Sequence, residues 1–385
     1  MNYLTRKLKD IALIRTGKLD SNAAVENGAY PFFTCDPQTL RIDKWAYDTE
    51  AVLLAGNNAS GNYTAKYYCG RFNAYQRTYI IETADSESLN TRFLCYAINQ
   101  KLSLLKTMSS GSTTKFLTIR MLHDLDIPCP TIEEQCKIIN RLGALDDLIE
   151  NNQKQIKLLE EAAQRLYKEW FVDLRFPGYE NTPIVDGVPE GWKIANIGSL
   201  CSHINAGGTP SRSNKNYWDN PTVKWYKTGE LQDCWLLDSD EMISQEGLER
   251  SSAKTFPPNT ILMAIYASPT LGRLGVLSST AACNQAALCL LANEEIVSWQ
   301  WLYSKLYELR DDFNAVAKGA GQQNISAETV KKKEVVLPPR RIINGFTVLV
   351  SPMYDERLLL QKQIRILSDA RDRMLPKLMN GEIEV

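Results

Sequence analysis

The chain has 385 residues, enough for two domains that each bury a core of their own. Hydrophobic residues make up 44% and charged residues 23%, and no apolar run approaches the roughly 18 residues of a membrane span, which argues against an integral helical membrane protein. The net charge of −1 argues against a large non-specific electrostatic grip on nucleic acid, and a polar start with nine scattered cysteines favours reduced thiols in a cytoplasm.

The first 130 residues predict a globule of mixed helix and strand. Short apolar runs at 52–55 and 78–81 are typical of buried strands, and helical apolar spacing extends from Asn90 to Leu105. Polar loops at 56–64 and 109–115 lie between these elements, and their amide, hydroxyl and basic side chains suit hydrogen bonds to base edges and phosphates. Composition alone favours an ordinary surface turn for each loop.

A long helix is predicted next, between Pro130 and the Pro177-Gly178 pair. Its seam positions alternate spacings of four and three, as in a coiled coil. These positions are Ile138, Leu142, Leu145, Ile149, Asn152, Ile156, Leu159, Ala163, Leu166 and Trp170. Asn152 is a polar residue in the middle of the seam, where fixing the register explains it better than chemistry does. For the seam taken alone, a helix that only serves oligomerisation is the simpler interpretation.

The second half of the chain repeats the first. Residues 153–159 (Gln-Lys-Gln-Ile-Lys-Leu-Leu) recur at 361–367 (Gln-Lys-Gln-Ile-Arg-Ile-Leu), an offset of 208 that holds from about residue 52 to 170. Near the two starts the best match has an offset of 186, which predicts about 22 extra residues in the second copy. Apolar runs at 261–265 and 287–291 and a helix from Ser298 to Phe313 follow the first copy's order. The second seam comprises Phe346, Val350, Met353, Arg357, Leu360, Ile364, Leu367, Arg371, Met374 and Leu378.

The repeat predicts an α+β fold in which two similar mixed α/β domains are separated by two long helices that form an antiparallel coiled coil with pseudo-two-fold symmetry. The predicted boundaries are 1–130 for the first domain, 131–176 for the first helix, 177–338 for the second domain and 339–385 for the second helix. Some 40 helical residues make a rod of roughly 60 Å.

No pattern of catalytic residues is present, so we predict neither a catalytic residue nor a metal site. His123 and His203 are the two histidines and are not related by the repeat. Phosphate-loop and zinc-ligand spacings are absent, and Cys283 with Cys289 lacks partner ligands. Gly207-Gly208-Thr209-Pro210 is predicted to be a turn, and the acids Asp238, Asp240 and Glu241 favour a solvated turn over a metal site.

Two segments carry a family resemblance. Gly191-Trp192-Lys193, Gly207 to Ser211, Tyr217-Trp218 and Val223-Lys224-Trp225 resemble the opening of a target-recognition domain of Type I restriction-modification specificity subunits. Leu117 to Gln135, with Asp126-Ile127-Pro128 and Glu133-Glu134-Gln135, resembles that family's junction into a conserved helix. The second junction, Pro338 to Ile343, lacks Glu-Glu-Gln, so its helix cap and contacts need not be equivalent.

The resemblance implies a specificity subunit without catalysis of its own. Each domain would read one half of a bipartite site on double-stranded DNA, and the helices would set the gap and dock two methyltransferase subunits, which motor-nuclease (restriction) subunits join. AdoMet, ATP and Mg²⁺ would belong to those partners, and this chain would hold no cofactor. The alternatives are an orphan DNA-binding regulator on the same scaffold and a coiled-coil interaction protein. The family's recognition domains vary freely, so the resemblance implies no target sequence.

The candidate DNA-binding residues come from the polar loops and the recognition-domain openings. The loops Gly111 to Lys115 and Gly319 to Gln323 superimpose at the offset of 208, which makes them the leading candidates; Gln322 and Gln323 suit a bidentate contact with adenine, and Lys115 a phosphate contact. The full set is Asn57, Asn58, Ser60, Asn62, Tyr63, Lys66, Ser112, Thr113, Thr114, Lys115, Thr209, Ser211, Arg212, Lys227, Tyr266, Arg273, Gln322, Gln323 and Asn324.

Overall fold

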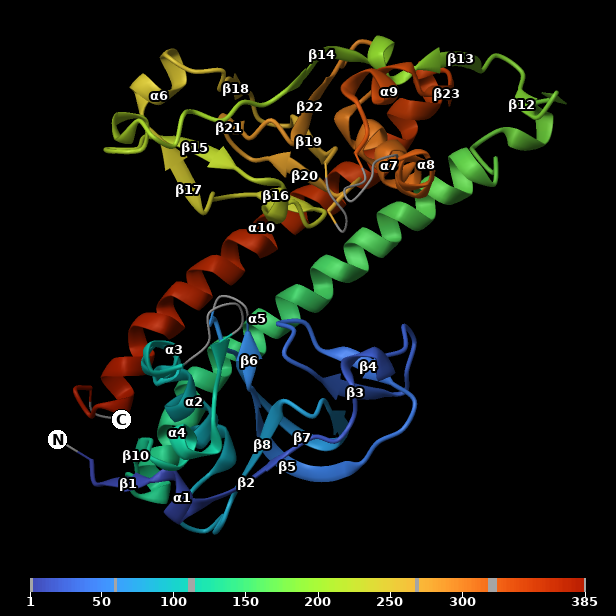
Figure 1. Ribbon diagram of the computed structural model, residues 1–385. Helices are drawn as coiled ribbons and strands as arrows, with labels where there is room; N and C mark the ends of the chain where they lie inside the picture. The colour runs from blue at the N-terminus through green and yellow to red at the C-terminus, as the bar shows by residue number, and fades with distance from the viewer. Residues whose placement is uncertain (1–2, 59–60, 110–114, 267–269, 318–323, 384–385) are drawn as a thin grey trace. The chain divides into compact units, whose positions relative to one another are not determined.

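The computed structural model describes residues 3–58, 61–109, 115–266, 270–317 and 324–383 (Figure 1). The chain divides into two compact units, which we call unit 1 (1–150 with 365–385) and unit 2 (151–364). Within the described ranges, none of the helices is both long and apolar enough to cross a membrane.

Unit 1 is built on a six-stranded sheet with the strand order β2-β8-β5-β7-β3-β4. The strands are β2 (Ala12–Thr16), β3 (Tyr30–Phe33), β4 (Leu40–Ile42), β5 (Tyr47–Ala55), β7 (Ala65–Ala74) and β8 (Thr78–Thr83). Neighbours are antiparallel except β3 and β7, which pair in parallel at Phe32–Asn73 and Phe33–Ala74. Val52 and Leu54 on one face pack with the helices, and Leu53 on the other face packs with Phe33 and Phe72.

Short elements complete unit 1. These are β1 (Thr5–Lys7), α1 (Leu8–Ile11), the 3-10 turn η1 (Ser21–Ala23), β6 (Asn57–Asn58), α2 (Thr91–Gln100), α3 (Leu102–Met108), β9 (Lys115–Phe116), α4 (Ile119–His123) and β10 (Asp126–Pro128). β1 pairs with β10, and β6 with β9. The helix predicted from Asn90 to Leu105 is therefore wrong in one respect: it is two helices. Asn90 caps α2 through its side chain, and α2 ends at Gln100, followed by the C-cap residue Lys101 with a ψ of −1°.

Unit 2 divides the same strands between two sheets, with the orders β14-β22-β19-β20-β16 and β17-β15-β21-β18. Their bounds are β14 (Cys201–Ala206), β15 (Val223–Tyr226), β16 (Cys234–Leu236), β17 (Glu241–Ile243), β18 (Thr255–Phe256), β19 (Ile261–Ala264), β20 (Leu274–Leu277), β21 (Ala281–Cys283) and β22 (Ala287–Ala292). Small pairs also form between β11 (Ile184–Val185) and β12 (Val188–Pro189), and between β13 (Lys193–Asn196) and β23 (Glu334–Leu337).

The helices of unit 2 match those in the described part of unit 1, except that the first has no counterpart there. They are α6 (Gln245–Glu249), α7 (Trp299–Glu308), α8 (Arg310–Val316) and α9 (Ala327–Lys332), with 3-10 turns η3 (Tyr179–Asn181), η4 (Ile197–Leu200), η5 (Lys215–Tyr217) and η6 (Thr228–Glu230). The helix predicted from Ser298 to Phe313 is again two, capped by Ser298 and broken at Leu309, where ψ is 0°. The helices are interrupted at corresponding residues, Lys101 and Leu309, which indicates that the repeat extends to local backbone geometry.

The long helices are α5 (Ile132–Tyr167) and α10 (Arg340–Met379), and each begins in one unit and ends in the other. α5 does not continue to Pro177: a π-helical turn, η2 (Lys168–Val172), follows it, and Leu174 has a positive φ of 58°. In unit 2 the helices pair antiparallel, because Asn152 donates to Gln363 at 3.1 Å while Glu160 faces Arg357 at 3.5 Å. The predicted α+β fold with two long helices is confirmed.

The structural register confirms the repeat and corrects its offsets. Asn196 faces Glu334 as Lys7 faces Asp126, so the starts are 189 residues apart (196 minus 7) and not 186. The sheets are 209 apart, because Ala264 donates to Arg273 as Ala55 donates to Thr64, and the helices from α2 onward are 208 apart. The offset of 186 rested on two-residue sequence matches, which are too short to detect such small shifts. The second copy therefore carries about 20 extra residues between β14 and β19 (209 minus 189), not 22.

Candidate nucleic-acid interface

In unit 1, two candidate loops that are distant in sequence meet at a short strand ladder. Asn57 pairs with Phe116 and Asn58 with Lys115 across β6 and β9. Asn57, Asn58 and Lys115 are half-buried, and the Arg77 guanidinium lies 5.2 Å from the Phe116 ring centroid. The ladder places amides and cations together, which is the combination that base-edge and phosphate contacts need. We call Asn57, Asn58, Lys115 and Phe116 the β6–β9 ladder.

Asn62 and Lys106 extend the β6–β9 ladder. The Lys106 ammonium donates to the Asn62 side-chain oxygen at 2.6 Å, and both side chains are exposed. Gly61 has a φ of +73°, and a Cβ there would lie 2.8 Å from the Lys115 side chain. This glycine therefore lets the turn approach Lys115 closely, which no other residue type would do without strain.

The side chains of two other candidates in unit 1, Tyr63 and Lys66, make contacts within the domain. Tyr63 is only 5% exposed and belongs to the core beneath the helices, so it is a core residue and its prediction as a DNA contact is wrong. The ammonium of Lys66 donates to Thr39 at 3.1 Å and to the Asp36 carbonyl at 3.4 Å. Partial burial lowers the pKa of Lys66, and Asp36 opposes that shift.

Unit 2 forms a shorter equivalent of the β6–β9 ladder. Tyr266 and Asn324 form an antiparallel bridge at the positions that correspond to Asn57 and Phe116, and both are exposed. Arg273, immediately before the strand that corresponds to β7, is half-buried. An exposed tyrosine beside an exposed amide offers a stacking surface and a base-edge donor in one place.

The recognition-domain opening in unit 2 forms a second polar cluster around Glu241. The Arg212 guanidinium lies 3.6 Å from the Trp218 ring centroid and forms an ion pair with Glu241, which also accepts from Lys227 at 2.9 Å. Hydrogen bonds from Arg212 and Lys227 lower the pKa of Glu241, so it is ionised at neutral pH. One carboxylate thus binds two of the predicted DNA-binding residues, and the three side chains together carry a net charge of about +1.

Thr209 and Ser211 lie beside this cluster. Thr209 donates to the Gln285 side chain, and Ser211 bonds Ser213 at 2.8 Å. Both serines are exposed, and Thr209 is half-buried.

Gly207 and Gly208 serve packing, as the predicted turn requires. A Cβ on Gly207 would lie 2.3 Å from the Cys283 carbonyl oxygen, and one on Gly208 would lie 2.2 Å from the Ser252 carbonyl oxygen. Gly17 is the equivalent of Gly207 in unit 1, where a Cβ would lie 2.1 Å from the Ala74 oxygen. Both copies have a glycine here because the backbone passes too close to a carbonyl oxygen of a neighbouring strand for a Cβ to fit.

Six predicted residues lie outside the described residues: Ser60, Ser112, Thr113, Thr114, Gln322 and Gln323. The described part also brings in residues outside the predicted DNA-binding set, namely Arg77, Lys106, Trp218 and Gln285. Lys106 lies at the end of a helix and Gln285 follows a strand, so neither falls in the Gly-rich loops that composition highlights. Each of them contacts a candidate residue or the β6–β9 ladder in the fold, and the sequence carries no signal for these contacts.

The seam positions of the long helices are all buried or half-buried. Ile138, Leu142, Phe346 and Val350 are fully buried. Asn152 is 6% exposed and bonds Gln363, as expected for a residue that fixes register. Arg357 is 3% exposed and donates to the Asp233 carbonyl at 3.0 Å, so the polar positions of the second seam also have partners.

Among the residues that the structure describes, no group of three or more His, Cys, Asp or Glu side chains is arranged to hold a metal ion. Asp238 forms an ion pair with Lys224 at 3.3 Å, and Glu241 bonds Arg212 and Lys227. Cys283 and Cys289 are buried in a hydrophobic cluster, and burial raises the pKa of Cys289 well above that of an ordinary thiol.

Comparison with known proteins gives one consistent result. The family model described as "Type I restriction modification DNA specificity domain" matches residues 2–161 and 189–365. The specificity subunit of the Type I restriction enzyme MjaIX from Methanocaldococcus jannaschii is 28% identical over 77% of this chain and 69% of its own length. The HindI specificity subunit from Haemophilus influenzae is 24% identical over 76% of each chain. The crystal structure of an S subunit from M. genitalium has the same fold, with a TM-score of 0.59, 16% identity and coverage of 98% and 96%.

Proposed function

This chain belongs to the Type I restriction-modification DNA specificity domain family, and on that premise we propose that it recognises a bipartite DNA sequence. Each unit contributes one recognition domain, and each domain reads one half of the site. The presence of two copies of one domain in a single chain carries this proposal, because two similar readers suit a site with two halves.

The β6–β9 ladder and its equivalent at Tyr266 and Asn324 support the assignment of the DNA-facing surface. Both lie where the sheet meets a loop, and both present amides beside cationic or aromatic groups. Bases are read by such side chains in the major groove, whereas lysine and arginine mainly hold phosphates. We therefore propose that Asn58, Asn62 and Lys115 face DNA in unit 1, and Tyr266 and Asn324 in unit 2.

The long helices are proposed to set the gap between the half-sites and to dock two methyltransferase subunits, which motor-nuclease subunits then join. Several large apolar side chains remain exposed on these helices, namely Leu148, Leu158, Val348, Leu349, Leu359 and Ile366. Exposed apolar side chains on a helix that has already buried its seam suit a second helical partner.

We further propose that the chain itself is non-catalytic and works in the cytoplasm. The reactions would belong to the partners, which would bind AdoMet, ATP and Mg²⁺. The absence of a recognisable nucleophile or phosphate-loop motif from the sequence supports this division of labour.

A domain exchange tests the reading of half-sites. Residues 1–130 are replaced by the first domain of another family member, and the methylated motif is determined by long-read sequencing of the host genome. We expect one half of the motif to change while the other half and the gap stay the same. A change in both halves contradicts the assignment of one domain to one half.

A heptad deletion tests the role of the helices. Removing Asn152 to Leu158 together with Leu360 to Ile366 preserves the seam and shortens each helix by about 10 Å. We expect the gap of the methylated motif to shrink while both half-sites persist. An unchanged gap with intact half-sites would show that the helices do not measure distance.

A further inference from the structure

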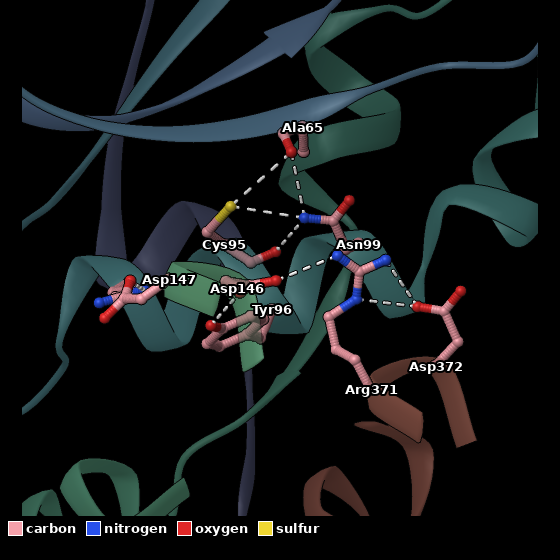
Figure 2. Close-up of polar contacts among 9 residues, drawn as sticks. Ala65, Cys95, Tyr96, Asn99, Asp146, Asp147, Arg371 and Asp372 are labelled. Atoms are coloured by element: carbon pink, nitrogen blue, oxygen red, sulfur yellow. Dashed lines mark hydrogen bonds and ion pairs between the residues drawn. The ribbon is translucent and has the colours of Figure 1, made fainter. Parts of the chain in front are cut away.

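The two units differ most where the sheet meets the long helices. In unit 1 this place is a cavity of about 630 Å³, lined by Ala65 and Tyr67 of β7, by α2 and α3, and by both long helices. Its charged residues are Arg92, Asp146, Asp147, Glu150, Arg371 and Asp372, and Figure 2 shows most of them around Tyr96. We call it the unit 1 cavity.

In unit 2 the corresponding place is filled by the chain itself. The hairpin between β3 and β4 in unit 1 spans residues 34–39, whereas its counterpart between β15 and β17 spans 227–240 and contains β16. β16 adds a parallel strand to β20, with Trp235 opposite Val276. The Asp233 N–H donates to the Leu274 carbonyl at 2.8 Å, and the Ser278 N–H donates to the Leu236 carbonyl.

The corresponding strand edge in unit 1 has no such neighbour. With the sheet offset of 209, Leu274, Val276 and Ser278 correspond to Ala65, Tyr67 and Cys69. On the side of β7 away from β5, the described part of the chain provides only β3, which pairs with Asn73 and Ala74. An uncovered strand edge is a template for pairing with another strand.

The contacts of Asp233 and Trp235 confirm that the two places are equivalent. Asp233 forms an ion pair with Arg310, and the Trp235 indole donates to the Tyr354 carbonyl at 3.1 Å. Arg310 and Tyr354 correspond at the helix offset of 208 to Leu102 and Asp146, and both of these line the unit 1 cavity. The segment 233–236 is therefore an internal example of what the unit 1 cavity can accept.

The unit 1 cavity has the opposite charge preference. Around Asp233 in unit 2 lie Arg310 and Arg357, whose counterparts in unit 1 are Leu102 and Ile149. Four carboxylates and two guanidiniums line the unit 1 cavity, so it carries a net charge of about −2 at neutral pH. Arg371 is bound by Asp146 at 3.0 Å and Asp372 at 2.8 Å, and Arg92 by Asp147 at 2.9 Å.

Two side chains contact the backbone of the β7 edge at the unit 1 cavity. The Asn99 amide donates to the Ala65 carbonyl at 3.2 Å, the atom that corresponds to the acceptor of the Asp233 N–H in unit 2. The Cys95 thiol contacts the same oxygen, and burial raises its pKa to about 12, so it stays protonated. The thiol is a weak donor and lies 3.9 Å from this oxygen, so the carbonyl, which has two lone pairs, can still accept from an incoming strand.

From these contacts we propose that the unit 1 cavity docks an extended, basic segment of a partner polypeptide, which adds a strand to β7 beside Tyr67 and places a lysine or arginine among Asp146, Asp147 and Glu150. The acidic lining disfavours DNA at this place. The site is separate from the proposed DNA-facing ladder, so it adds a second partner surface to the same unit.

Two fluorescent peptides test the proposal by anisotropy titration against the full chain. Both carry the sequence of residues 230–239 with Glu230→Gln, Cys234→Ser and Asp238→Asn; one keeps Asp233 and the other has Asp233→Arg. We expect the arginine peptide to bind at least about ten-fold more tightly. Failure of both peptides to saturate, or equal binding, overturns the proposal.

A charge swap in the chain provides the matched control. Leu102→Arg installs the residue that unit 2 has at the first position of the equivalent helix, so the fold should tolerate it, and we expect the preference for the arginine peptide to be lost. Leu104→Arg, an exposed position on the same helix outside the cavity lining, should leave the preference unchanged. Should Leu102→Arg fail to fold by circular dichroism, Asp147→Asn with Glu150→Gln should reduce the preference. A preference that survives in folded cavity variants overturns the proposal.

DNA titrations on the same preparations keep this test apart from the proposed function. We expect Leu102→Arg to leave DNA affinity within two-fold of the parent chain. If the unmutated chain shows no specific DNA binding, the proposed function is contradicted, while the peptide result still stands.

Discussion

Unit 1 and unit 2 pack equivalent helices against similar sheets, but the side chains at the contact are aromatic in unit 2 and mostly charged in unit 1. Unit 2 fills the contact with aromatic rings: Tyr167, Trp170 and Phe171 surround Phe346, and Trp299 packs between Trp235 and Tyr354. Unit 1 uses Tyr96, Asp146 and Arg371 around an open cavity. A repeated fold therefore fixes where the elements lie, and each copy remains free to be a closed core or an open binding surface.

The largest expected difference between the units concerns their buried seams. Phe346→Ala removes a fully buried ring that contacts three other rings and should destabilise unit 2 by about 3–5 kcal/mol. Ile138→Ala, the equivalent change in unit 1, should cost about 2–5 kcal/mol. Denaturant unfolding can separate the two, because seven of the eight tryptophans are in unit 2 and Trp45 alone is in unit 1.

Tryptophan fluorescence should therefore report the Phe346→Ala loss, while circular dichroism reports both variants. A loss in tryptophan-detected stability that is larger for Ile138→Ala than for Phe346→Ala would contradict the packing contrast.

The second largest difference is expected between Arg357 and Arg371, whose replacement should cost different amounts of stability. The Arg357 side chain is 4% exposed and pairs with Glu160, so Arg357→Met leaves a half-buried carboxylate without its cation and should cost about 3–5 kcal/mol. The Arg371 side chain is 30% exposed, and Arg371→Met should cost no more than about 1 kcal/mol. Denaturant midpoints in low and high salt provide the measurement, and similar losses in the two variants would remove the distinction between a buried and a solvated pair.

The crossing glycines should behave alike in the two units. Gly17→Ala and Gly207→Ala each force a Cβ against a carbonyl oxygen, and we expect both to cost about 1–3 kcal/mol. Gly229→Ala is the control, because nothing lies within 4 Å of a Cβ there. Thermal unfolding measures all three, and a neutral result at Gly17 or Gly207 would show that the backbone can move aside.

The smallest effects are expected at the proposed DNA-facing residues. Lys115→Ala should weaken binding to all sequences alike and lower the slope of log K against log salt by about 1, as for one lost phosphate contact. Asn324→Ala in unit 2 should instead cost about 1–3 kcal/mol on the specific site alone. Titrations of matched and half-mismatched duplexes at several salt concentrations decide, and a motif-dependent effect of Lys115→Ala would contradict its role as a phosphate contact.

The sequence predicted the parts of this architecture that depend on periodicity. The seam from Ile138 to Trp170 and its repeat follow from spacings of three and four, and the mixed α/β globules follow from alternating apolar runs. The breaks at Lys101 and Leu309 could not be predicted, because the apolar pattern continues across them. The unit 1 cavity was also missed, since it depends on a shorter hairpin and on residues from four separate segments.

The candidate DNA surface was predictable only as a set of polar loops. Asn57, Asn58 and Lys115 were named from composition, but their meeting across a two-residue ladder depends on pairing between distant segments. Tyr63 was misplaced because a tyrosine in a polar loop looks exposed, whereas its ring completes the core. Local composition does not reveal which loop residues the core recruits.

The division of α5 and α10 between the units has a consequence for the gene. Leu378 and Met379, almost at the end of the described chain, are buried in the core of unit 1 with Phe93 and Leu142. A nonsense mutation after codon 364 would leave unit 2 whole and damage the unit that was synthesised first. Recombination that exchanges only the recognition domains leaves the contact between the end of α10 and the core of unit 1 unchanged. A crossover within a long helix joins helix segments from two parents, and these segments must still pack together.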